Sequence, residues 1–388
     1  MLRHSHVLAI GIICAFLLSF IACSPRSSDV SASRTSTRDR SNNTTIPVTP
    51  LTACFAVNRD NANIIGRQYM KDDIVYLEWT NSGVELCFTG TGIKAMIGSA
   101  EANPNNYPAI SVQIDDREPE RITVNNSCLL TLANNLEPGS HTMRLIKVTE
   151  ATNSPLLLSS VTILSDGGDV PPSLLPPPER PLRRIEFIGD SITCGFGNLG
   201  NSSSARFLTE EQDGLQTYAA FTASALNAEA HYICVSGKGI VKNVNGDTYD
   251  LLPTLFTFVS PSFRKPWDAS LWQPDVVVIN AGTNDVSAHA DRQEFLIGAV
   301  AFLEQIRRSY PKAEILWCYG MMNREMSDTI AAAVQQFNAI DGHAYYLQLN
   351  GMLIGEGGAV GHPNVKAHRS RSEILTSKIK DVTGWSEQ

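Results

Sequence analysis

The chain has 388 residues, a length that predicts one very large domain or two ordinary ones. Its formal net charge of −8 argues against a nucleic-acid-binding protein, because such proteins usually carry a basic face. An uncharged partner, either a polysaccharide or a small molecule, fits this charge better. Hydrophobic residues make up 43% of the chain, which is ample for packed cores.

The first 23 residues resemble a targeting segment. Arg3 precedes an apolar run from Val7 to Ala22, which is short for a membrane span and has the length of a signal-peptide core. The run ends at Phe20-Ile21-Ala22-Cys23, similar to the bacterial lipobox, whose cysteine is lipidated. Residues 1–23 are therefore expected to be a lipoprotein-type signal peptide with a lipid anchor at Cys23; plain secretion and an uncleaved anchor are the alternatives.

Residues 24–50 are expected to be a disordered tether. They are rich in Ser, Thr, Arg and Asn and hold almost no apolar residues, so they cannot bury enough surface to fold. Ser24 follows the cysteine with no acidic residue beside it, which resembles lipoproteins sorted to the outer membrane. The expected location is the bacterial cell envelope, periplasmic or surface-facing.

The cysteines beyond the signal segment show no CxxC spacing or clustering with histidine, which argues against a structural zinc site. Cys234 and Cys318 lie in apolar runs and are expected to be buried thiols. A disulfide among Cys54, Cys87 and Cys128 fits an oxidising compartment, but the sequence does not decide whether it forms.

Residues 51–165 predict an antiparallel β-sandwich, jelly-roll-like. Apolar and polar residues alternate along Ile110–Ile114, and turn residues such as Pro138-Gly139-Ser140 separate the apolar runs. The other expected strands are Ile74–Trp79, Val84–Phe88, Ile93–Ile97, His141–Val148 and Leu156–Leu164. Residues 166–182 hold two proline clusters and are expected to be a stiff linker, packed between two domains.

Residues 183–388 alternate strand-like and helical patterns, which predicts a doubly wound α/β domain with a parallel sheet. Val276–Ile279 is fully apolar, as expected of a strand covered on both faces. The other expected strands are Ile185–Ile188, Tyr232–Val235, Ile315–Tyr319 and Tyr345–Leu349. Helical spacing marks Leu215–Ala225, Phe295–Ile306, Ile330–Phe337 and the stretch from Pro363 to about Val382.

Three short segments follow strands of this domain, at the edge where open α/β sheets place their active sites. Gly189-Asp190-Ser191 offers a hydroxyl nucleophile and the Ser191 N–H. Ser236-Gly237 offers a backbone N–H that can approach a ligand closely, and Gly282-Thr283-Asn284-Asp285 offers the Asn284 amide. Asp285 is expected to brace its loop or to contact substrate. Taken alone, the first two segments are better explained as an ordinary turn and a loop glycine, and the third, which could be an Asx-type turn, is the most specific.

His362, followed by Pro363, lies just before the last helix and late in the chain, the best placement among the histidines for a base that takes a proton from Ser191. A serine, a histidine and the three hydrogen-bond donors of Ser191, Gly237 and Asn284 are the parts that ester hydrolysis by a serine nucleophile needs.

The four segments in this order resemble the SGNH (GDSL-type) hydrolase superfamily, over roughly residue 184 to the C-terminus. The resemblance implies that Ser191 is the nucleophile, that His362 is the base, and that Ser191 N–H, Gly237 and Asn284 form the oxyanion site. The superfamily usually has an aspartate three residues before the histidine, where this chain has Ala359. A backbone carbonyl is then expected to hold the Nδ1 proton, with Glu356 as a second candidate.

A β-sandwich before such a domain resembles carbohydrate esterase family 2, as do the phrases from Ile185 to Gly195, from Val235 to Ile240 and from Tyr319 to Met322. This resemblance implies removal of O-acetyl groups from polysaccharides such as acetylated xylan or glucomannan by a Ser–His dyad, without a metal or cofactor. An aromatic residue beside the acetyl group is also implied; Trp317 and Trp272 are candidates that are equally expected in the core.

Other interpretations stay open at this point. The ester could be on peptidoglycan or be another acyl ester or thioester, the enzyme could be an acetyltransferase, or the chain could be a non-catalytic glycan-binding lipoprotein. The β-sandwich is expected either to bind sugar or to serve as a scaffold.

Overall fold

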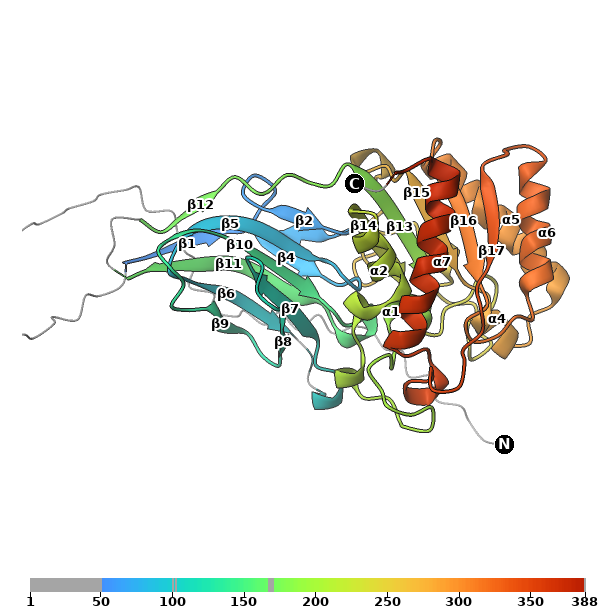
Figure 1. Cartoon of the computed structure of the whole chain (residues 1–388), viewed down its shortest axis with the longest axis horizontal. Coiled ribbons are helices and arrows are strands. Elements are labelled where there is room, and N and C mark those ends of the chain that lie inside the picture. Colours follow the sequence, from blue (N-terminus) through green and yellow to red (C-terminus); the bar gives the residue numbers. More distant parts are fainter. Residues whose placement is uncertain (1–50, 100, 102, 167–170, 387–388) are drawn as a thin grey trace, which may run out of the picture. The chain divides into compact units, whose positions relative to one another are not determined.

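The computed structural model describes residues 51–99, 101, 103–166 and 171–386. Two six-stranded antiparallel sheets are followed by a five-stranded parallel sheet with helices on both faces (Figure 1). The expected signal peptide, its lipidated Cys23 and the tether lie outside the described residues, so they stay predictions. Within the described part of the chain, no helix is both long enough and apolar enough to cross a membrane.

The two antiparallel sheets confirm the predicted β-sandwich. The first sheet has the order β3 (Tyr69–Lys71), β4 (Ile74–Leu77), β11 (Leu156–Ser165), β6 (Gly92–Ser99) and β9 (Cys128–Ala133), with β1 (Leu51–Ala56) also paired to β11. The second has the order β12 (Ser173–Leu175), β5 (Gly83–Gly90), β10 (Gly139–Lys147), β7 (Ala109–Ile114) and β8 (Glu120–Thr123), with β2 (Asn63–Ile65) on β5. Side chains of Ile97 and Val161 from one sheet and Phe88 and Leu145 from the other belong to one buried cluster.

The structure adds strands that the sequence did not predict, and it changes the interpretation of the linker. Strands β2, β3 and β12 have three residues each, too few for an alternating pattern to be recognised. Because β12 pairs with β5, residues 173–175 belong to the sandwich, and the expected linker is in part an edge strand.

The parallel sheet has the strand order β14 (Ala228–Cys234), β13 (Arg183–Gly189), β15 (Val276–Asn280), β16 (Glu314–Tyr319) and β17 (Ala344–Gln348). If the five strands are numbered by their order in the chain, they lie side by side as 2-1-3-4-5. The chain therefore changes direction across the sheet between β13 and β15. In open α/β sheets, ligands bind beyond the carboxyl ends of the strands at that point.

Helices cover both faces of this sheet, as predicted. Helices α2 (Tyr218–Ala225) and α7 (Val365–Thr383) pack together, and α5 (Arg292–Ser309) packs on α6 (Ser327–Asn338). Alternate residues of β15 enter two different cores: Val276 and Val278 pack with α2 and α7, whereas Val277 and Ile279 pack with α5 and α6. The strand is buried along its whole length, which explains its uninterrupted apolar sequence.

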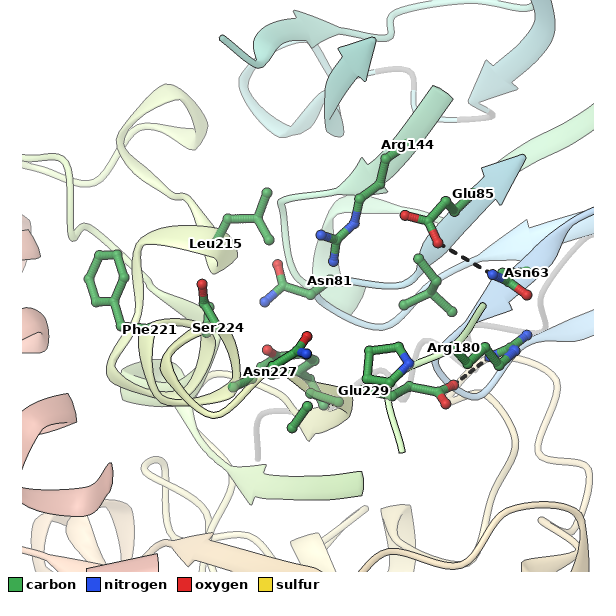
Figure 2. Close-up of a pocket in the computed structure, with 17 residues that line it drawn as sticks. Asn63, Asn81, Glu85, Arg144, Arg180, Leu215, Phe221, Ser224, Asn227 and Glu229 are labelled. Carbon is green, nitrogen blue, oxygen red and sulfur yellow. Dashed lines mark hydrogen bonds and ion pairs between the residues drawn. The ribbon is translucent and has the colours of Figure 1, made fainter. Parts of the chain in front are cut away.

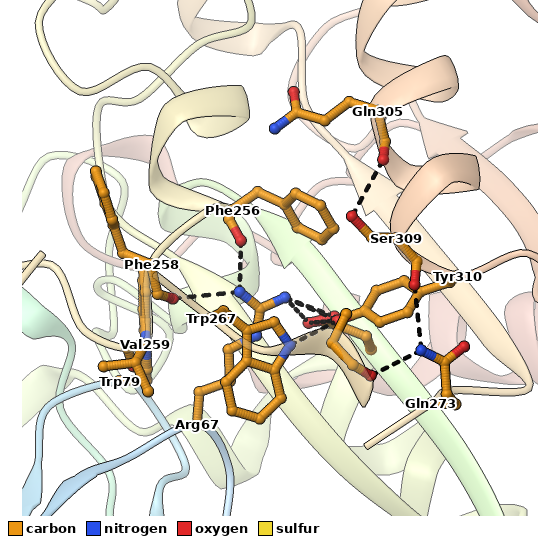
Figure 3. A network of polar contacts seen from close by, with 12 residues as sticks. Arg67, Trp79, Phe256, Phe258, Val259, Trp267, Gln273, Gln305, Ser309 and Tyr310 are labelled. Atoms are coloured by element: carbon orange, nitrogen blue, oxygen red, sulfur yellow. Dashed lines mark hydrogen bonds and ion pairs between the residues drawn. The ribbon is translucent and has the colours of Figure 1, made fainter. Parts of the chain in front are cut away.

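A buried ion pair joins the sandwich to the first strand of the parallel sheet. Arg67 Nη2 donates to both carboxylate oxygens of Glu186 on β13, at 2.5 and 2.9 Å, and both side chains are fully buried. Tyr310 also donates to Glu186, and Arg67 Nη1 donates to the carbonyl oxygens of Phe256 and Phe258 (Figure 3). Most donors of the guanidinium therefore have acceptors, the condition under which a buried charge is tolerated.

We expect Arg67→Met to lower the free energy of unfolding by about 3–5 kcal/mol, because it leaves the Glu186 carboxylate buried without its partner. Urea unfolding of both proteins measures the difference. Arg308→Met is the control: Arg308 pairs with Glu304 on the surface of α5, and such pairs contribute about 0.3–0.5 kcal/mol. Equal stability of Arg67→Met and Arg308→Met would contradict this account.

Candidate active site

Ser191 lies directly after β13, where the strand turns into a short helix. Helix α1 (Ser191–Cys194) begins at this serine, and Asp190 caps it by accepting a hydrogen bond from Ile192 N–H at 3.0 Å. Strands β14 and β15 end beside the same point, since Gly189 is in register with both Cys234 and Asn280. The three segments singled out in the sequence therefore follow neighbouring strand ends.

The structure brings Ser191 and His362 together from opposite ends of the α/β domain. Nε2 of His362 lies 2.9 Å from Oγ of Ser191, and Nδ1 lies 3.3 Å from the carbonyl oxygen of Val360. A carbonyl can only accept, so this contact assigns the proton to Nδ1 and leaves Nε2 free to accept from the serine hydroxyl.

The carbonyl of Val360 is positioned by an unusual backbone conformation of that residue. Its φ of +53° is in the left-handed region, which a β-branched residue rarely adopts. The following Gly361 also has a positive φ of +71°. Strain of this kind persists where the surroundings enforce it, often at functional sites.

Two expectations about the orientation of His362 are now decided by the structure. Ala359, which replaces the aspartate of the superfamily pattern, is fully buried, and the neighbouring carbonyl of Val360 faces Nδ1 instead. Glu356 is not the orienting group: it forms a buried ion pair with Arg371 at 2.7 Å and accepts from Leu353 N–H.

The loop that carries His362 is fixed against the loop after α1 by close backbone contacts. Ala359 N–H donates to Gly197 O at 2.9 Å, and Val360 N–H donates to Ala205 O at 2.9 Å. A Cβ atom on Gly200 would lie 2.5 Å from Ala359 N, so the two loops pack this closely only because glycine is present.

An aromatic pair that the sequence analysis missed lies beside the histidine. Phe196 stacks on Phe207 with ring centroids 3.8 Å apart, and the Phe196 ring centroid is 4.7 Å from that of His362. Burial in these surroundings lowers the pKa of His362 below its ordinary value of 6.5. The neutral imidazole, which is the form that can accept a proton, is therefore favoured.

The loop after β14 contains Gly237, whose φ is +79°. Asn284 and Asp285, which the sequence analysis singled out after β15, hold this loop. Asn284 Nδ2 donates to Lys238 O at 2.8 Å and to Asp190 Oδ2 at 3.2 Å. Both amide hydrogens of Asn284 thus have acceptors, and the longer bond to Asp190 is the one that a ligand oxygen could replace.

The prediction that Asp285 contacts substrate is wrong. Its carboxylate is fully buried and accepts hydrogen bonds from the N–H groups of Ile240, Val241 and Lys242 at 2.8–3.1 Å. It is the brace for the loop that the sequence analysis offered as the alternative. Burial also raises the pKa of the neighbouring Asp190 to about 7, with a further contribution from the charge of Asp285.

Neither tryptophan named from the sequence lies at the site. Trp317 is fully buried and donates to Ala281 O at 3.2 Å, and Trp272 stacks on His231 with centroids 3.6 Å apart. His368 on α7 is also a packing residue: it is buried and accepts from Tyr218 N–H.

All six cysteines of the described chain are free, so Cys54, Cys87 and Cys128 form no disulfide with one another; Cys234 and Cys318 are buried, as predicted. Over the same described ranges, no group of three His, Cys, Asp or Glu residues could hold a metal ion.

A cavity of about 430 Å³ lies between the sandwich and helix α2, away from the serine and histidine (Figure 2). Arg144 and Glu85 line one side, and Asn227 and Glu229 line the other. Ser191 and His362 are not among its lining residues, so the chemistry of the site does not depend on this cavity.

Comparison with known proteins agrees with this geometry. Residues 187–369 match the GDSL-like Lipase/Acylhydrolase family, and residues 64–178 match the Carbohydrate esterase 2 N-terminal family. The structure of a family two carbohydrate esterase from Clostridium thermocellum in complex with cellohexaose is 31% identical, covers 84% of this chain and 100% of its own, and superposes with a TM-score of 0.77. The chain belongs to carbohydrate esterase family 2.

Curated relatives of this esterase point to the same enzyme class. The Cellulase/esterase CelE of Acetivibrio thermocellus is 34% identical over 79% of this chain, and the chain spans 38% of the length of CelE. An Acetylxylan esterase / glucomannan deacetylase of Cellvibrio japonicus is 24% identical over 86% of this chain and 92% of its own length. Both names are those of carboxylic ester hydrolases, the class predicted from the sequence.

We expect Gly200→Ala to displace the His362 loop, because the added methyl group would meet the Ala359 backbone. Labelling of Ser191 by a fluorophosphonate, which needs the nearby base, should slow by up to about 10²-fold, the cost of moving a reacting group by about 1 Å. Gly139→Ala is the control, since a Cβ there meets nothing within 4 Å. Labelling of Gly200→Ala at the rate of Gly139→Ala would contradict this account of the loop contact.

Proposed function

We propose that this family member removes O-acetyl groups from a polysaccharide of the xylan or glucomannan type, with Ser191 and His362 acting as a dyad. The observation that carries the proposal is the 2.9 Å approach of His362 Nε2 to Ser191 Oγ, with Nδ1 facing a carbonyl oxygen. The names of the Cellvibrio and Acetivibrio relatives support the substrate class.

In the first half-reaction, His362 Nε2 takes the hydroxyl proton as Ser191 Oγ attacks the acetyl carbonyl carbon. The tetrahedral intermediate collapses, the bond to the sugar oxygen breaks, and that oxygen receives the proton from His362. In the second half-reaction, water attacks the acetyl-serine while His362 again accepts a proton. The second tetrahedral intermediate collapses, the bond between the acetyl carbon and Ser191 Oγ breaks, and Oγ takes the proton back from His362. Acetic acid leaves and gives its own proton to solvent, which yields acetate.

The negative oxygen of each tetrahedral intermediate needs fixed hydrogen-bond donors. The backbone N–H groups of Ser191 and Gly237 supply two of them in this proposal. The Asn284 amide supplies the third when the oxyanion replaces Asp190 as acceptor of the hydrogen bond that measures 3.2 Å. The group that faces Nδ1 of the imidazolium is a neutral carbonyl, a weaker partner than the carboxylate of a triad.

Wild-type protein is expected to release acetate from acetylated xylan or glucomannan, and Ser191→Ala is expected to release none above the uncatalysed rate. Acetate release, measured in parallel on O-acetylated peptidoglycan, tests the substrate class. Faster release from peptidoglycan than from either plant polysaccharide would overturn the proposed substrate. Binding of these polysaccharides without acetate release would instead favour the non-catalytic alternative.

The pH profile of kcat/KM should have its acidic midpoint below pH 6.5, because burial lowers the pKa of His362 and the neutral form is the base. Activity is then lost as the pH falls through that lowered pKa. Asp190→Asn is the control, since burial raises the pKa of the neighbouring Asp190 carboxyl to about 7, close to this range. A midpoint above 6.5 that persists in Asp190→Asn would contradict the assignment to His362.

A further inference from the structure

We propose that Glu150, contributed by the β-sandwich, is a positioning residue that aims the Gly237 N–H of the oxyanion site. The proposal rests on the proposed function, because it concerns the donors that the esterase reaction uses. Glu150 lies in the connection between β10 and β11 and is 86 residues from its partner in the sequence.

The Glu150 carboxylate binds both hydrogen-bond donors of one serine. Oε2 accepts from Ser236 N–H at 2.8 Å, and Oε1 accepts from Ser236 Oγ at 2.6 Å. Glu150 is 2% exposed, and Ser236 is half-buried, so competition from water for these bonds is reduced. A carboxylate held in this two-point geometry fixes the orientation as well as the position of Ser236.

The orientation of Ser236 decides where the next N–H points. Ser236 and Gly237 share one planar peptide unit, so a rotation of Ser236 turns the Gly237 N–H with it. The rest of the loop is held independently, by Asn284 at Lys238 and by Asp285 from Ile240 onwards. Glu150 of the sandwich therefore holds Ser236 at the start of the loop, whereas residues of the α/β domain hold the rest of the loop.

A second contact of Glu150 leads to the helix of the nucleophile. Gln212, which is fully buried, donates from Nε2 to Glu150 Oε1 and to Cys194 O, both at 3.4 Å. Cys194 ends the helix that begins at Ser191. The Glu150 carboxylate thus contacts Ser236, the residue before Gly237, and reaches the helix of Ser191 through Gln212. These two segments carry the N–H groups that face the oxyanion in the proposed reaction.

Lys147 holds the backbone of Glu150 and supplies a compensating charge. Its Nζ donates to the carbonyl oxygens of Glu78, Thr149 and Glu150 at 2.6–3.1 Å. Burial lowers the pKa of Lys147 to about 8, so it is still mostly protonated at neutral pH. The Glu150 carboxylate is therefore preorganised before substrate arrives.

The chain offers a matched control for this arrangement. Glu78, also in the sandwich and 1% exposed, accepts from the N–H and Oγ of Ser262 and from Oγ of Ser260. The chemistry and the burial resemble those of Glu150, but the loop that contains Ser260 and Ser262 does not include an oxyanion donor. Loss of Glu78 should weaken the contact between sandwich and α/β domain without turning the Gly237 peptide.

The test is the hydrolysis of p-nitrophenyl acetate by wild type, Glu150→Gln and Glu78→Gln. Glutamine keeps the size of the side chain but places an NH2 group against one of the two serine donors. Removal of an oxyanion donor lowers kcat by about 10²–10³-fold, so misdirecting one predicts a fall of at least about tenfold in Glu150→Gln. KM should stay within about twofold, because the oxyanion exists only in the transition state and the intermediates. Glu78→Gln should keep the wild-type kcat.

Wild-type kcat in Glu150→Gln would overturn the proposal, and so would an equal loss of kcat in Glu78→Gln, which would indicate a general loosening between sandwich and α/β domain. A rise in KM at unchanged kcat would overturn it as well.

If wild type hydrolyses p-nitrophenyl acetate but no acetylated polysaccharide, the substrate proposal alone fails and this comparison still decides the role of Glu150. A wild type that is inert toward p-nitrophenyl acetate overturns both.

Discussion

The ion pair between Arg67 and Glu186 is the contact on which the arrangement of the described chain depends. Two charges removed from water are stable only if their remaining hydrogen-bonding groups are satisfied, which requires Tyr310 and the Phe256 carbonyl to be in their present positions. Glu186 lies on the same strand that presents Ser191 at its end. The sandwich is thereby attached to the strand that leads to Ser191 rather than to a peripheral helix.

Two buried carboxylates of the sandwich also bind loops of the α/β domain. Glu78 binds the serines of one loop and Glu150 binds the serine that precedes Gly237, while Lys147 joins the backbones of both. Each carboxylate accepts from an N–H and from a hydroxyl, so the contacts are directional. A surface that only excluded water would not need such geometry, and the sandwich therefore helps to determine the local structure around the site.

Local patterns in the sequence predicted most of the fold and the central pair of the site. The apolar runs at Val276–Ile279 and the alternation at Ile110–Ile114 report burial of neighbouring residues, which a single segment can reveal. The contacts of Arg67 and Glu150 join residues 119 and 86 positions apart, and no local pattern encodes such a pairing. The sequence left two roles open for Asp285 for the same reason, since only the folded chain shows that its carboxylate binds the loop at 240–242.

The left-handed backbone at Val360 places a peptide oxygen against Nδ1 of His362, so the contact that orients this ring does not depend on acidity. The oxygen that faces Nδ1 belongs to a peptide group, which cannot be neutralised by acid as a carboxylate can. The acceptor that orients the ring therefore stays available at every pH at which the chain is folded, whereas an aspartate would lose that role once it was protonated. A backbone contact beside Ala359 thus stands where the superfamily usually has a carboxylate, and it tolerates acidic surroundings.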